Sequence, residues 1–91
     1  MKCFIVAESA HQAMNTARID WGWDKGNRFG VVENHKGEKV EYLSDMERLR
    51  GLARGQVKIY KGWRWYKNKK LHDLETECKI REWVLTDNPN E

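Results

Sequence analysis

The chain opens with a continuous apolar run and then changes to a helical pattern. Residues 2–8 contain five apolar side chains in succession, which is typical of a strand buried on both faces of a helix-covered parallel sheet. Ser9 follows this strand and has the side chain of a helix N-cap. Apolar residues then recur at helical spacing from Ala10 to Ala17, so the sequence predicts a helix over residues 10–19.

Two short segments rich in β-branched and aromatic residues come next, at residues 28–33 and 39–43. The five residues between them include Gly37, which suits a turn that requires a positive φ angle. This arrangement predicts a β-hairpin.

A second helix and another strand are predicted after the hairpin. Ser44 and Glu47 have the spacing of a capping box, in which each side chain bonds a free amide of the first helical turn. Gly51 and Gly55 limit this helix to about two turns. Residues 57–63 are then predicted to form a strand.

The last predicted elements are the longest helix, over Leu71–Leu85, and a flexible polar tail over residues 86–91. The resulting order is β-α-(ββ)-α-β-α, in one domain that spans residues 1–85. Strand–helix–strand connections imply parallel pairing with right-handed crossovers. The sequence therefore predicts a small α/β sandwich with a three- to four-stranded, mostly parallel sheet.

Charge is distributed unevenly along the chain. Residues 48–70 hold nine basic side chains and no acidic one, whereas residues 1–47 hold six and eight, and residues 71–91 hold two and six. Four of the ten aromatic residues also fall in the basic block, which is our name for residues 48–70. Cationic groups hold phosphates and aromatic rings stack on bases, so this composition favours a nucleic-acid or other polyanionic partner.

The candidate binding residues come from this block. They are Arg50, Arg54, Trp63, Arg64, Trp65, Tyr66, Lys67, Lys69 and Lys70. Ligands of open α/β sheets bind beyond the carboxyl ends of the strands, and residues 63–67 follow one predicted strand end. We therefore expect Arg64 and the lysines to hold phosphates while Trp65 or Tyr66 stacks on a base.

Each part of this interpretation has an alternative. The flanking acidic residues can fold back and neutralise the block, and Arg50 and Arg54 can pair with acids instead of phosphates. Trp63 can cover the sheet as part of the core, and Trp65 is equally suited to core and surface.

Catalytic and metal-binding signatures are weak. The three histidines lack zinc-ligand spacing, and the sequence has no phosphate-binding glycine loop and no nucleophile elbow. The remaining enzymatic hypothesis is acid–base chemistry by Glu8, Ser9, His11 and Asp45. Against it, Ser9 and Asp45 already suit capping roles, so we expect no catalytic activity, no metal and no cofactor.

The stretch Tyr42–Leu52, followed by Val57–Trp63, resembles a pattern in small phage-encoded α/β proteins: a strand, a Ser/Asp-capped helix with an L-R-G-L core, and a strand ending in G-x-W. The resemblance covers a third to a half of the chain. It implies a phage or prophage accessory protein that acts by stoichiometric binding. The hairpin at residues 28–43 departs from this pattern by adding a strand.

Two functions follow as hypotheses. The first is a non-catalytic, phage-type protein that binds nucleic acid through the basic block. The second is a phage-encoded inhibitor, of an anti-CRISPR or other anti-defence type, that docks on a host nucleic-acid-processing protein through the same tryptophans and arginines. We expect a cytoplasmic protein without a membrane span, since no apolar run is long enough and the two cysteines read as buried thiols. Homodimer formation stays open.

Overall fold

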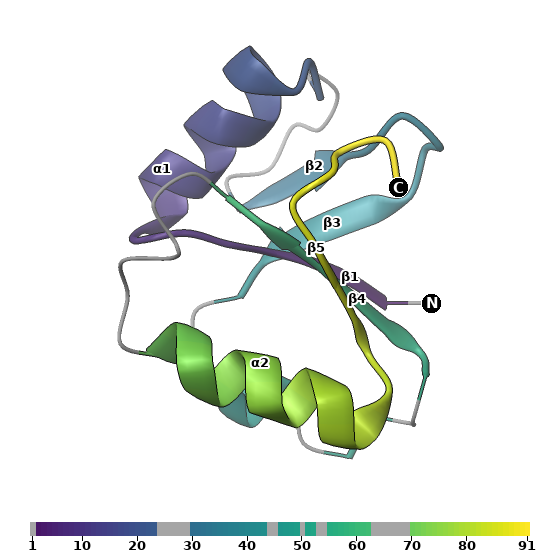
Figure 1. The fold of residues 1–91 in the computed structure, drawn as a ribbon. Helices are drawn as coiled ribbons and strands as arrows, with labels where there is room; N and C mark the ends of the chain where they lie inside the picture. Colours follow the sequence, from purple (N-terminus) through teal and green to yellow (C-terminus); the bar gives the residue numbers. More distant parts are fainter. Residues whose placement is uncertain (1, 24–29, 44–45, 50, 53–54, 63–69) are drawn as a thin grey trace.

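The computed structural model describes residues 2–23, 30–43, 46–49, 51–52, 55–62 and 70–91. Five strands and two α-helices make up most of this part of the chain (Figure 1). In chain order the elements are β1 (Lys2–Val6), α1 (Ala10–Asn15), the π-helix η1 (Thr16–Asp20), β2 (Val31–Glu33), β3 (Lys39–Tyr42), the 3₁₀-helix η2 (Met46–Leu49), β4 (Val57–Lys61), α2 (Lys70–Arg81) and β5 (Val84–Thr86).

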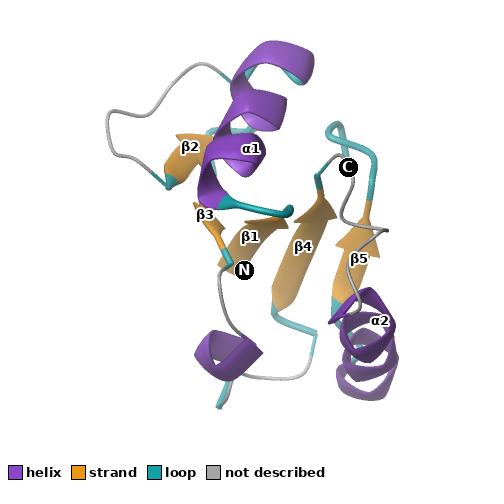
Figure 2. Cartoon of the chain, turned by 90° about the vertical axis from the view of Figure 1, so that its left-hand side faces the viewer, coloured by secondary structure: helices purple, strands orange, loops and turns teal. Residues whose placement is uncertain are grey.

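All five strands form one sheet in the order β2-β3-β1-β4-β5. β1 pairs in parallel with both β3 and β4, and β4 pairs in parallel with β5, so four strands point the same way (Figure 2). β2 runs antiparallel to β3 and forms the predicted hairpin with it. The small, mostly parallel α/β fold is therefore confirmed, although the sheet has five strands where three or four were predicted.

The fifth strand comes from the end of the predicted helix over Leu71–Leu85, and that prediction was wrong for its last four residues. α2 ends at Arg81, and Glu82 adopts a left-handed conformation with φ of 57°. The Trp83 amide then bonds the Cys78 carbonyl at 3.0 Å, the six-to-one bond of a Schellman cap. Beyond this turn the chain pairs with β4 instead of continuing the helix.

The first helix is confirmed at its start and differs at its end. The Ser9 hydroxyl accepts a hydrogen bond from the Gln12 amide at 3.2 Å, as an N-cap does. The predicted α-helix over residues 10–19 changes to a π-helix after Asn15. The Trp21 amide closes this wider turn on the Thr16 carbonyl at 3.1 Å.

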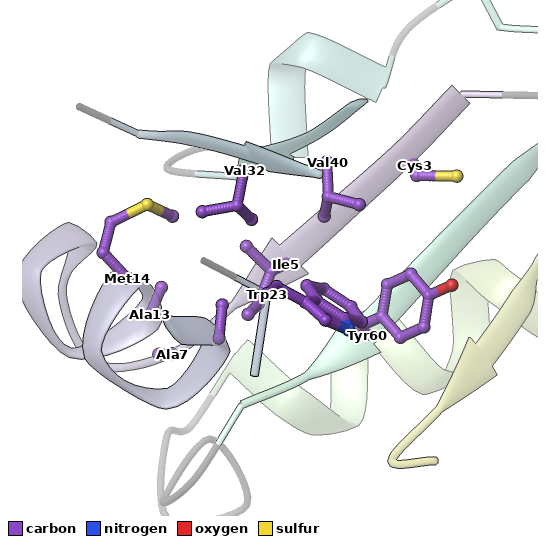
Figure 3. Close-up of a cluster of buried hydrophobic side chains, with 10 residues drawn as sticks. Cys3, Ile5, Ala7, Ala13, Met14, Trp23, Val32, Val40 and Tyr60 are labelled. Atoms are coloured by element: carbon purple, nitrogen blue, oxygen red, sulfur yellow. The ribbon is translucent and has the colours of Figure 1, made fainter. Parts of the chain in front are cut away.

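The sheet has a core on each face, because α1 and α2 lie on opposite sides of it (Figure 1). On the α1 side the core, shown in Figure 3, contains Cys3, Ile5, Ala7, Ala13, Met14, Ala17, Trp23, Val32, Val40 and Tyr60. On the α2 side it contains Phe4, Val6, Leu43, Leu49, Val57, Ile59, Leu74, Cys78 and Trp83. The two cysteines are buried free thiols in different cores.

The C-terminal residues return to the sheet. Thr86, which the sequence assigns to the tail, is the last residue of β5 and is buried. Its hydroxyl donates to a Glu91 carboxylate oxygen at 2.6 Å, and the Lys58 ammonium donates to the Glu91 backbone oxygen at 2.9 Å. The end of the domain predicted at residue 85 therefore falls inside a strand.

Candidate functional site

The carboxyl edge of the sheet is the place where ligands of open α/β sheets bind. β1, β3, β4 and β5 all end there, because they are parallel. Two chain segments that leave this edge are fastened to the central strand. The Leu43 amide bonds the Ile5 carbonyl at 2.9 Å, and the Gly62 amide bonds the Val6 carbonyl at 2.7 Å.

Gly62 has a steric reason to be glycine. A Cβ atom at this position would lie 2.6 Å from the Val6 carbonyl oxygen and 3.3 Å from the Ala7 Cβ. The close approach brings the end of β4 against the end of β1. The chain then continues from this point into residues 63–69, the aromatic-rich end of the basic block.

The predicted binding residues themselves are not part of the described structure. Arg50, Arg54, Trp63, Arg64, Trp65, Tyr66, Lys67 and Lys69 lie outside the described residues, and Lys70 is described only as the first residue of α2. Whether Trp63 and Trp65 belong to the core or to the surface therefore stays a prediction.

Three other cations of the basic block are described, and two of them have internal partners. Arg48 forms an ion pair with Glu41 at 2.7 Å, so one flanking acid does fold back on the block. Lys58 is 8% exposed and lies on an interior strand of the sheet, with β1 on one side and β5 on the other. Lys61 is half-buried at the carboxyl end of β4.

Acidic side chains are present at the same edge. Glu8 follows β1 and Asp87 follows β5, and both are exposed. Carboxylates at these places oppose the approach of an anionic ligand such as a phosphate.

The residues of the acid–base hypothesis have other contacts. The Ser9 hydroxyl is held by the Gln12 amide, and a ring nitrogen of His11 lies 3.3 Å from the Asn15 amide nitrogen. Asp45 lies outside the described residues. What the structure describes of this group is thus a helix cap and an exposed polar pair.

A second polar group, which sequence reasoning missed, lies on the α1 face near the amino ends of β1 and β4. The Asn34 amide nitrogen donates to Glu38 at 2.9 Å and to the Tyr60 hydroxyl at 3.3 Å. The Cys3 thiol donates to the other Glu38 oxygen at 3.8 Å. The signal for it is the V-K-I-Y-K alternation of β4, which puts Lys58 and Tyr60 on the face opposite Val57 and Ile59.

The ionisation of this group follows from its contacts. The Asn34 hydrogen bond lowers the pKa of Glu38, so this carboxylate stays charged. Burial acts to lower the pKa of Lys58, but the Tyr60 hydroxyl and the Glu38 charge offset it and the net shift is upward. Burial and the Glu38 charge both raise the pKa of the Cys3 thiol. The group therefore holds one charged carboxylate, one charged ammonium and a neutral thiol.

A cavity of about 370 Å³ opens beside this group, where Trp23 meets the hairpin turn of residues 34–37. The Trp23 Nε1 atom is buried and has no hydrogen-bond partner among the described residues. Its nitrogen is on the side of the indole next to Tyr60, whose ring is 4.9 Å away and almost perpendicular (Figure 3).

Searches among protein-family models, curated proteins and solved structures found no match to this chain. In the part of the chain that the structure describes, no three metal-ligating side chains come together, and no helix is long and apolar enough to cross a membrane.

Proposed function

We propose that the protein is a non-catalytic nucleic-acid-binding protein whose contact surface is the segment of residues 63–70 and the arginines before it. The observation that carries the proposal is the position of Gly62. Gly62 follows the last residue of β4 at the shared carboxyl edge of four parallel strands, where α/β proteins bind their ligands. The basic and aromatic segment comes directly after it.

The proposed contacts divide by chemistry. Arg64, Lys67 and Lys69 hold phosphates, and Trp65 or Tyr66 stacks on a base at about 1–3 kcal/mol. Lys70, Arg50 and Arg54 add positive charge. Arg48 and Lys58 are left out of the contact surface, because both have partners within the protein. The Arg48 guanidinium pairs with Glu41, and the Lys58 ammonium donates to the Glu91 backbone oxygen.

The test is a fluorescence anisotropy titration of labelled single- and double-stranded DNA and RNA across salt concentrations. Binding of micromolar strength should weaken steeply with salt, because phosphate contacts release counterions. The double substitution R64A/K67A should weaken it and reduce the salt slope by about 0.7 per lost contact on a single strand. The matched control is Lys36→Ala, an exposed lysine in the hairpin turn at the opposite end of the sheet.

Absence of binding at low salt would contradict the proposal, as would equal losses in R64A/K67A and Lys36→Ala. The basic block would then be either solvated surface or the docking face of an anti-defence inhibitor for a host protein, the second function inferred from the sequence. A phage-type accessory role in the cytoplasm belongs to both versions and rests on the motif resemblance described above.

A further inference from the structure

The α1 face of the sheet is covered by two different kinds of structure. Over β1 and β3 the cover is α1 and its apolar side chains. Over β4, the cover includes the C-terminal residues, which leave β5 and curl back across the sheet (Figure 1). We call residues 87–91 the C-terminal strap.

The sheet supplies polar groups to this strap. The Lys58 ammonium donates to the Glu91 backbone oxygen at 2.9 Å, and the Tyr60 hydroxyl donates to the same oxygen at 3.4 Å. Tyr60 is fully buried and Lys58 is 8% exposed. A buried ammonium requires a partner, because an unpaired charge in a poorly solvated place is unfavourable. Glu38 supplies an opposite charge nearby, and the strap supplies the hydrogen-bond acceptor.

The strap itself is held almost wholly by polar contacts. Thr86 donates to the Glu91 carboxylate at 2.6 Å, and the Asn90 amide bonds the Asn88 side chain at 3.0 Å. Four of its five residues are exposed, and Pro89 is half-buried. A segment with so little buried apolar surface opens at low free-energy cost, so another chain with the same groups can take its place.

We propose that the surface formed by Lys58, Tyr60 and Thr86 is a binding site for an extended acidic peptide, and that the C-terminal strap is its built-in ligand. The site recognises a main-chain oxygen through Lys58 and Tyr60 and a carboxylate through Thr86, as Glu91 shows. This inference is independent of the proposed nucleic-acid function, because its contacts are made by Lys58, Tyr60 and Thr86 and by none of residues 63–70.

The test uses the full chain and a fluorescent peptide with the sequence of residues 86–91. In the unmodified protein the strap competes at the high effective concentration of a tethered ligand, so the peptide should bind weakly. In the double variant N88A/E91A, the strap loses its internal Asn88–Asn90 hydrogen bond and the Glu91 carboxylate that Thr86 holds, so the apparent affinity for the peptide should rise at least tenfold. Adding Lys58→Met should remove this gain, whereas Lys36→Met should not.

Three results would overturn the inference. The first is a folded N88A/E91A protein whose affinity for the peptide stays within twofold of the unmodified protein. The second is equal binding of a peptide whose acidic residues are replaced by lysine. The third applies if the variant does not fold. Millimolar acidic peptide is then added to the unmodified protein, and it should shift the NMR amide signals of Tyr60 and Glu91. Unchanged signals would refute the site.

Discussion

Replacing Gly62 by alanine tests how tightly the ends of β1 and β4 meet. The new Cβ would lie 2.6 Å from the Val6 carbonyl oxygen, a backbone atom that cannot rotate away. Overpacking of this kind costs roughly 1–3 kcal/mol. The same displacement stretches the 2.7 Å bond from the Gly62 amide to that oxygen, and a lost hydrogen bond adds about 1 kcal/mol. We expect Gly62→Ala to lower the free energy of unfolding by about 3 kcal/mol.

The assay is urea unfolding followed by circular dichroism, together with a thermal melt. In a domain of this size 1 kcal/mol corresponds to about 4–8 °C, so the midpoint should fall by roughly 12–24 °C. The m-value should not change, because the surface exposed on unfolding stays nearly the same when one methyl group is added.

Gly37 is the matched control, since it needs glycine for a different reason. Its φ is +78°, and a Cβ there would meet nothing within 4 Å. Asparagine tolerates this conformation, so Gly37→Asn should be nearly neutral while Gly62→Asn should be at least as harmful as Gly62→Ala. A Gly62→Ala protein within about 0.5 kcal/mol of the unmodified protein would refute the steric argument, since surface substitutions without a specific cause fall in that range.

Three further predictions test other parts of the fold. Glu82→Gly should stabilise the protein by about 0.5–1 kcal/mol in urea unfolding, because glycine favours the φ of 57° at this cap, whereas Glu75→Gly inside α2 should destabilise it by about 1 kcal/mol. Burial raises the pKa of Cys78 to about 11, so the unfolded thiol ionises at lower pH than the native one. The free energy of unfolding should therefore fall between pH 9 and 11, and Cys78→Ala should show a flatter profile over that interval. Glu41→Gln breaks the exposed pair with Arg48 and should change the free energy of unfolding by less than about 1 kcal/mol; a larger loss would mean that the pair is not screened by solvent.

The elements that could be predicted from the sequence are those with local signals. The apolar run of β1, the Ser9 cap of α1 and the glycine turn between β2 and β3 each depend on neighbouring residues, and all three are present. Their physical causes act within a few positions of the chain, where a pattern can be read.

β5 was missed because its sequence fits two structures. Trp83, Val84 and Leu85 extend the apolar stripe of α2, and the residue that ends the helix, Glu82, is not a usual left-handed cap. Pairing of Val84–Thr86 with β4 decides between helix and strand. That pairing is a tertiary contact, and helical periodicity carries no information about it.

The polar surface beneath the C-terminal strap was missed for a related reason. Lys58 and Glu91 are 33 positions apart, and Asn34 and Tyr60 are 26 apart. No local spacing connects them. The basic block had the opposite problem: its charge was plain in the sequence, but the partner of Arg48 could be identified only once Glu41 was placed beside it.

The central position of β1 also affects how the chain acquires its structure. This strand precedes both of its neighbours in the chain, and it hydrogen-bonds β3 on one side and β4 on the other, more than thirty residues later in each case. A growing chain therefore holds β1 unpaired until the segments of β3 and β4 have followed it. Folding of this kind is slow for its size and leaves the early strand open to pairing with other chains. Protection of the five residues of β1 from pairing with other chains therefore depends on how soon β3 and β4 pair with them.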